Sequence, residues 1–141
     1  RVDELSWDQA VDGDVYQLSG TKSCFHEPLD DTILQRMSER DLHSTGPMWG
    51  AGELMSQSTV REQELAVAGQ FASLCQGLEK HGLKQERRAL RLLVGELSHQ
   101  WLDDDSLEVS FSLPPGSYAT SVLQELGQFR DIAELNRNKT D

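Results

Sequence analysis

The sequence of 141 residues lacks features that mark several large classes of protein. It has no run of about 18 apolar residues, which excludes a transmembrane helix, and no signal peptide is visible at its start. Its two cysteines, Cys24 and Cys75, stand far apart without a C-x-x-C pair. The sequence does not exclude a disulfide between them, but two isolated cysteines form no disulfide framework and suit a reducing compartment. We therefore predict a cytoplasmic protein that is not embedded in a membrane.

The chain also has few cations, since 13 Lys and Arg stand against 24 Asp and Glu, for a formal net charge of −11. Polyanions bind basic surfaces, so this balance argues against a nucleic-acid-binding domain. The length is that of one ordinary domain. The chain begins at Arg1 rather than at a methionine. We expect that a segment has been removed or that the chain is a piece of a longer protein.

Familiar catalytic and metal-binding motifs are absent as well. The sequence contains no G-x-S-x-G, Walker loop or Rossmann fingerprint. Aspartates cluster at positions 12 and 14 and at 103–105, but neither cluster has the spacing of a calcium loop, and polar turns explain both. The four histidines show no ligand spacing, and His43 and His81 are expected at the surface. We predict no metal site.

Hydrophobic patterning indicates an α+β fold. After a hairpin-type turn at 12–13, alternation predicts a strand over 15–19. A helix is expected to begin at Pro28, because a proline in the first helical turn loses no hydrogen bond, and its apolar residues recur at four-residue spacing. Residues 41–58 are rich in glycine and proline, which favours a structured loop.

Two further helices are predicted in the middle of the chain. The first begins with a capping-box pattern at Thr59, ends at Gly82 and carries an apolar stripe. The stripe consists of Val67, Phe71, Leu74, Cys75 and Leu78. The second helix is expected over 85–97. It places four cations at i, i+3, i+4 and i+7, on one narrow face that could meet RNA phosphates. These are Lys84, Arg87, Arg88 and Arg91. Alternatively, they form a solvated face balanced by nearby glutamates.

The last part of the chain is the most informative. Apolar residues alternate over 107–113, which predicts a half-buried strand. Two prolines stop the strand, because proline offers no amide to a ladder. A glycine then permits a sharp turn, and Thr120 or Ser121 can cap a short helix that ends at Gly127. A lone strand cannot satisfy its amides, so we expect it to join a sheet largely outside the chain.

The loop between this strand and the short helix is the candidate binding site. Small residues leave backbone amides exposed and aim one aromatic, Tyr118, outward, with Gly116, Ser117 and Thr120 around it. An aromatic ring beside exposed amides can stack a flipped base, worth roughly 1–3 kcal/mol. The alternative is a tyrosine packed in the corner between strand and helix.

Four segments of the chain carry a family resemblance. They are V-D-G-D at 11–14, T-G-P-M-W-G-A-G at 45–52, Q-E-R-R-A-L-R-L at 85–92 and L-P-P-G-S-Y-A-T-S-V-L-Q-E-L at 113–126. In this order they resemble the signature of the tRNA pseudouridine synthase D (TruD) family, whose members isomerise uridine in tRNA. The resemblance extends over almost the whole chain.

The resemblance implies the C-terminal portion of such an enzyme. Residues 1–103 would be most of the family's inserted α/β accessory domain, and residues 104–141 a strand–loop–helix of the catalytic α+β domain. It also implies a tRNA substrate modified at uridine 13, no cofactor, and the missing N-terminal catalytic portion as a partner. The matching aromatic of the family lies in the active site, so Tyr118 is expected to contact the target nucleotide.

Departures from the family pattern limit what this chain supplies. The family's nucleophilic aspartate lies in a motif like G-x-K-D-K-x-A, which is absent here, as is its N-x-x-G-x-Q-R-F-G segment. We therefore expect no catalytic residue in this chain and no activity from it alone. Gln124 stands where relatives usually carry arginine, which puts a phosphate contact there in doubt.

The acidic balance has two explanations consistent with an RNA substrate: the carboxylates lie away from the RNA, or the missing portion is basic. Two other classes of function stay open from the sequence. The chain could be a non-catalytic module whose acidic surface binds a protein, or a purely structural domain. A G-x-K-D motif upstream of Arg1 would favour the enzyme.

Overall fold

The computed structural model of the chain describes residues 7–128. They fall into two compact units that divide between Arg91 and Leu92, called unit 1 and unit 2 below. The predicted boundary at residues 103 and 104 lies instead in the turn of a β-hairpin of unit 2. The assignment of either unit to a domain of the family stays a prediction.

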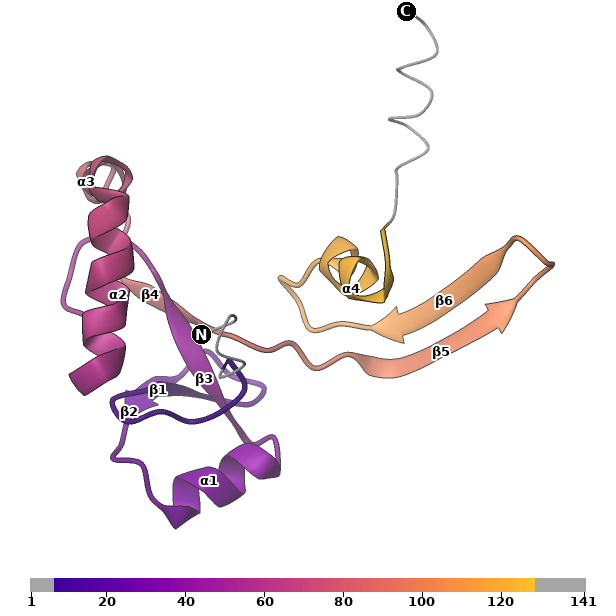
Figure 1. Cartoon of the computed structure of the whole chain (residues 1–141), viewed down its shortest axis with the longest axis horizontal. Coiled ribbons are helices and arrows are strands. Elements are labelled where there is room, and N and C mark those ends of the chain that lie inside the picture. Colours follow the sequence, from indigo (N-terminus) through magenta and orange to yellow (C-terminus); the bar gives the residue numbers. More distant parts are fainter. Residues whose placement is uncertain (1–6, 129–141) are drawn as a thin grey trace, which may run out of the picture. The chain divides into compact units, whose positions relative to one another are not determined.

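Unit 1 contains a four-stranded antiparallel sheet with the order β2-β1-β3-β4 (Figure 1). Its elements are β1 (Val15–Leu18), β2 (Cys24–His26), α1 (Asp31–Ser38), β3 (Leu42–Met48), α2 (Ser58–Gln70), α3 (Ala72–Lys80) and β4 (Glu86–Ala89). The strand predicted over 15–19 is confirmed as β1. It lies between β2 and β3, and Tyr16 stands opposite both Phe25 and Ser44. The side chain of Tyr16 is fully buried in the core.

The core of unit 1 forms where α1 packs on the sheet. Ile33 and Met37 are buried against Tyr16 and Leu42, as their four-residue spacing predicted. The helix begins at Asp31 rather than at Pro28. The reason is the side chain of Asp30, which accepts a hydrogen bond from the amide of Ile33 at 2.8 Å and caps the first turn.

The prediction of a loop over residues 41–58 is wrong in its first half. Residues 42–48 form β3, which pairs with β1 on one side and with β4 on the other. Its first four residues are buried, and among them His43, expected at the surface, is only 6% exposed. Gly46 and Pro47 lie at the end of β3 that pairs with β4. Pairing with β4 outweighs the weak strand preference of these two residues.

The helix predicted from Thr59 to Gly82 is present but interrupted at Phe71, so it forms α2 and α3. The predicted capping box is wrong. The residue before α2 is Gln57, whose side chain makes no capping hydrogen bond. Its amide instead donates to the carbonyl of Gly13 at 2.9 Å. Of the five residues of the predicted apolar stripe, Cys75 is half-buried and the other four are exposed, with Leu74 at 65%.

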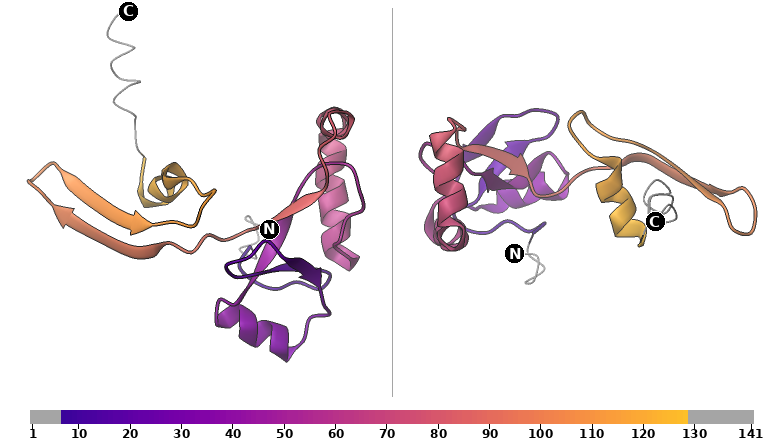
Figure 2. Two further views of the ribbon diagram at one scale, coloured as in Figure 1. Left: turned by 180° about the vertical axis from the view of Figure 1, so that it is seen from behind. Right: turned by 90° about the horizontal axis from the view of Figure 1, so that it is seen from above.

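Unit 2 is a β-hairpin followed by a short helix. Its elements are β5 (Gly95–Trp101), β6 (Leu107–Ser112) and α4 (Ala119–Leu126). The strand predicted over 107–113 is confirmed as β6, but the expectation that it lacks a partner in the chain is wrong. It pairs antiparallel with β5, with Trp101 opposite Leu107 and His99 opposite Val109. The two strands form a ribbon whose turn projects past α4 (Figure 2).

The helix predicted over residues 85–97 is also wrong, because β4 and the start of β5 occupy this stretch. In β4 the residues alternate between the two faces of the sheet: Arg87 and Ala89 lie on its more buried face, while Glu86 and Arg88 are exposed. Burial therefore follows the two-residue period of a strand. None of the described helices is long and apolar enough to cross a bilayer.

Candidate functional site

The loop between β6 and α4 is built around a tight turn. The amide of Ser117 donates to the carbonyl of Pro114 at 3.2 Å, and Gly116 has φ +85°. Pro115 at the second position and a positive φ at the third are the features of a type II turn, which a glycine adopts without strain. The backbone of this loop is therefore held by its own Pro-Pro-Gly sequence.

Tyr118 projects from the end of that turn. Its side chain is 70% exposed, and its backbone is extended immediately before the first residue of α4. The alternative of a tyrosine packed in the strand–helix corner is not what the structure shows. Gly116 and Thr120 are exposed beside it, and Ser117 is half-buried. Neither Thr120 nor Ser121 caps α4, because the helix begins at Ala119. The loop thus presents one aromatic ring on a fixed turn.

The four cations proposed for RNA phosphates do not share a face. Lys84 and Arg88 are exposed. The other two arginines are used inside unit 1. Arg87 is bound by Glu64 and Thr45, and Arg91 donates to carbonyls of residues 37 and 42. A phosphate contact by Lys84 and Arg88 stays a prediction.

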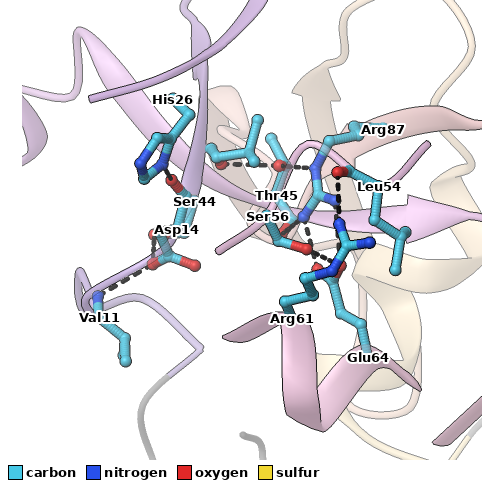
Figure 3. A network of polar contacts seen from close by, with 11 residues as sticks. Val11, Asp14, His26, Ser44, Thr45, Leu54, Ser56, Arg61, Glu64 and Arg87 are labelled. Atoms are coloured by element: carbon cyan, nitrogen blue, oxygen red, sulfur yellow. Dashed lines mark hydrogen bonds and ion pairs between the residues drawn. The ribbon is translucent and has the colours of Figure 1, made fainter. Parts of the chain in front are cut away.

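Sequence patterning missed a buried ion pair at the centre of unit 1 (Figure 3). A guanidinium nitrogen of Arg87 lies 2.6 Å from a carboxylate oxygen of Glu64, and the side chains are 5% and 9% exposed. Arg87 also donates to the hydroxyl of Thr45 at 2.7 Å and to its carbonyl at 3.0 Å. The hydroxyl of Ser56 donates to Glu64. The pair ties α2 to β3 and β4.

The V-D-G-D segment forms a second part of this polar network. A carboxylate oxygen of Asp14 accepts from the amide of Val11 at 3.0 Å and from the hydroxyl of Ser44 at 2.9 Å. Gly13 has φ +88°, and a Cβ there would overlap the carbonyl of Gln57. Glycine is therefore required where the segment meets the start of α2. This explains the motif by packing rather than by chemistry.

A third cluster joins β3 to the end of unit 1. The Nε of Arg91 donates to Nδ1 of His43 at 2.8 Å. An imidazole nitrogen that accepts this bond carries no proton, so His43 is neutral with its proton on Nε2. Nε2 lies 3.4 Å from the hydroxyl of Ser19. Burial lowers the pKa of His43, and the charge of Arg91 lowers it further, against the opposing charge of Asp41.

The stability of the chain should depend on pH through this histidine. A lowered pKa in the folded state means that the unfolded state binds more protons below the ordinary value of 6.5. The contribution of the neutral ring is fully present above that value and is lost as the pH falls from 6.5 toward the folded pKa. We expect His43→Asn, which keeps an acceptor for Arg91, to have a flatter profile in urea unfolding between pH 5 and pH 8. Parallel profiles for both proteins would contradict this.

The structure groups no three His, Cys, Asp or Glu side chains closely enough to hold a metal ion within residues 7–128. The exposed Tyr118 loop remains the candidate binding site, and the buried polar network stabilises the fold of unit 1.

Comparison with known proteins relates these features to one family. The family model of tRNA pseudouridine synthase D (TruD) matches residues 1–126, which include the loop and α4 up to its last residue. A solved structure assigned to TruD from Methanosarcina mazei matches with a TM-score of 0.60 and 20% identity over 84% of this chain and 31% of that one. At this identity the match shows a shared fold.

Curated relatives are closer in sequence. The chain is 45% identical over 138 residues to the tRNA pseudouridine synthase D of Xanthomonas campestris pv. campestris, and 47% identical over 139 residues to that of Xanthomonas oryzae pv. oryzae. Both matches cover 96% of this chain but 38% of the relative. The relative from Hydrogenovibrio crunogenus is 47% identical over 126 residues, 89% of this chain and 36% of its own length. By its match to the family model over residues 1–126, the chain belongs to the tRNA pseudouridine synthase D (TruD) family.

Proposed function

We propose that the chain is the C-terminal part of a tRNA pseudouridine synthase that isomerises a uridine of tRNA, at position 13, to pseudouridine. The observation that carries the proposal is the exposed ring of Tyr118 on its fixed turn, inside the segment that the family model matches. The share of 38% of the relatives' length supports the view that this chain is one part of a longer enzyme.

The isomerisation needs no redox partner. The bond between N1 of uracil and the sugar breaks, the base rotates, and a bond from C5 to the same sugar carbon forms, while a proton leaves C5 and one is added to N1. An aspartate either forms a transient bond to the nucleotide, which breaks again as C5 joins the sugar, or removes a sugar proton and returns it, so that the carboxylate is regenerated. The family's aspartate motif is absent from the 141 residues, so this carboxylate comes from the rest of the protein. No cofactor is required.

The Tyr118 loop would hold the target nucleotide outside the RNA stack. A base inside a folded RNA must be extruded before an enzyme can reach its sugar bond, and a stacking ring offsets part of that cost. The turn at Pro115 and Gly116 would keep the ring in place, and the exposed Thr120 and half-buried Ser117 border the same surface. Gln124, exposed on α4, would supply no charge to the backbone of the RNA.

We further propose that unit 1 is the inserted accessory domain and that unit 2 belongs to the catalytic domain. This moves the sequence-based boundary from 103–104 to 91–92 and assigns the whole hairpin to one domain. The support is the pairing of β5 with β6 over Gly95–Trp101 and Leu107–Ser112. The enzyme would act in the cytoplasm on tRNA, with the N-terminal portion of the same protein completing the active site.

The chain alone should form no pseudouridine on unmodified tRNA, because a positioned ring and turn cannot replace the missing carboxylate. Adding the remaining portion of the protein should restore activity if the two parts assemble. The measurement is tRNA-dependent pseudouridine formation by the purified 141-residue chain, with a thermal melt to show that the sample is folded. Conversion by the chain alone would refute the proposed division of roles.

A further inference from the structure

Helix α1 ends in a Schellman motif, a hydrogen-bonded reversal that closes many helices. The amide of Arg40 donates to the carbonyl of Met37 at 3.1 Å, and the amide of Asp41 donates to the carbonyl of Arg36 at 3.0 Å. These two bonds define the motif, with Glu39 as the C-cap and Arg40 as the residue after it. The chain then continues into β3.

The residue after the C-cap of this motif has a left-handed backbone, and glycine usually occupies it because glycine has no Cβ to clash. In this chain the position is occupied by Arg40, with φ +63°. An L-residue is strained in this region, because its Cβ crowds the carbonyl oxygen that follows. Arg40 therefore weakens the end of α1 relative to a glycine, unless its side chain offsets the strain.

The side chain of Arg40 makes no polar contact that would offset this strain. It is exposed, and in the described part of the chain its guanidinium has no hydrogen bond or ion pair. The two flanking carboxylates are held by other residues. Arg36 binds Asp41 at 2.7 Å, and the side-chain amide of Gln35 donates to Glu39 at 2.8 Å. Arg40 is thus a free cation at a strained position.

Two other described residues besides glycine have a positive φ, and contacts with other segments explain both. Ser58 (φ +46°) follows the amide that is bound to Gly13, and Glu96 (φ +51°) lies in an irregularity of the β5–β6 pairing. At Arg40 the bonds are those of the helix end itself, which glycine would make without strain.

Free arginine side chains are scarce in this acidic chain, whose formal net charge is −11. Only two of the six described arginines, Arg40 and Arg88, are exposed without a bond from the guanidinium. A guanidinium without a partner in the protein is suited to a phosphate, which it binds through two parallel hydrogen bonds. The other four bind groups inside unit 1: Arg36, Arg61, Arg87 and Arg91.

We propose that Arg40 binds a backbone phosphate of the tRNA, which makes the end of α1 part of the RNA-binding surface of the synthase. The inference rests on the proposed function, whose substrate is a tRNA. It accounts for both observations, because a strained cation without a partner in the protein is expected where a ligand supplies the partner. The alternative is that Arg40 serves the fold, through attraction to the negative end of the helix dipole. The two explanations predict opposite effects of glycine on stability.

Three substitutions separate the charge of Arg40 from its strain. Arg40→Gly removes both, Arg40→Gln removes the charge and keeps the strain, and Arg40→Lys keeps both. We expect Arg40→Gly to raise the melting temperature of this chain by roughly 2–8 °C, because glycine relieves the left-handed backbone. The other two variants should change it by less. In the full-length protein, the slope of the logarithm of the tRNA binding constant against the logarithm of the salt concentration should fall by about one unit with Arg40→Gly and Arg40→Gln. Arg40→Lys should keep the slope.

Two results would overturn the inference. A melting temperature that falls or stays the same with Arg40→Gly would mean that the cation serves the helix end. Equal slopes for Arg40→Gln and Arg40→Lys would mean that the charge meets no phosphate. Pseudouridine formation by the unsubstituted full-length protein is measured separately. Conversion together with equal slopes would reject the contact alone, whereas an absence of conversion would reject the proposed function.

Discussion

Replacing Tyr118 with alanine in the full-length protein should slow pseudouridine formation strongly and leave the fold intact. The ring is 70% exposed, so its loss removes little packing. Stacking of one base on an aromatic side chain is worth roughly 1–3 kcal/mol. At about tenfold for each 1.36 kcal/mol, this predicts a rate roughly 5- to 150-fold lower. Single-turnover conversion of unmodified tRNA measures the effect without a contribution from product release.

Tyr118→Phe is the matched control. It keeps the ring and removes only the hydroxyl, so it should be nearly silent. Thermal melting of both variants separates function from folding. Equal rates for the alanine and phenylalanine variants would show that the ring does not hold the base. A large fall in melting temperature with alanine would show that the rest of the protein packs on Tyr118.

The strand and turn around Tyr118 could be predicted because their determinants are local. Alternation over β6, two prolines and a glycine with positive φ lie within ten consecutive residues, Leu107–Gly116, and each acts on the backbone beside it. Helix α4 begins two or three residues earlier than a cap at Thr120 or Ser121 predicts. Local interactions also explain α1, because its buried residues Ile33 and Met37 and its cap at Asp30 all lie within about two turns.

Residues 85–97 were predicted to form a helix because their pattern fits both the 3.6-residue period of a helix and the two-residue period of a strand. Its cations fall at helical spacing, yet Arg87 and Ala89 also alternate with Glu86 and Arg88. What decides between them is a partner strand: Thr45 to Met48 of β3 pair with β4. Because β3 was itself expected to be a loop, the sequence offered no partner strand for residues 86–89, and a helix was predicted there instead. Strand preference depends on neighbours that a local window does not contain.

The buried ion pair illustrates the same limit for polar residues. Glu64 and Arg87 are 23 positions apart, and neither shows by its type that it is buried, since charged residues are rarely fully buried without a partner. The segments that resemble the family do contain residues of this buried network. Three of them, at 11–14, 45–52 and 85–92, supply Asp14, Thr45 and Arg87 to the polar network of unit 1. Their resemblance to the family thus reflects architecture as well as chemistry.

The largest effect on stability is expected from Arg87→Met. The substitution keeps an apolar stem but leaves the carboxylate of Glu64, only 9% exposed, without its cation. Breaking a buried pair in this way costs roughly 3–5 kcal/mol, a large part of the 5–15 kcal/mol that typically stabilises a domain. Urea unfolding of the chain, followed by circular dichroism, measures the loss as a shift of the midpoint.

Arg88→Met is the control, because Arg88 is the exposed neighbour on the same strand and its loss should change stability by less than about 0.5 kcal/mol. The double variant Arg87→Met with Glu64→Met should recover much of the loss, since no charge is then left unpaired. A cost for Arg87→Met as small as that of Arg88→Met would show that the pair does not hold α2.

The same two variants distinguish an effect on folding from an effect on RNA binding in the full-length protein. If only Arg88 meets a phosphate, Arg88→Met should lower the salt dependence of tRNA binding by about one unit of slope, whereas Arg87→Met should act through the fold.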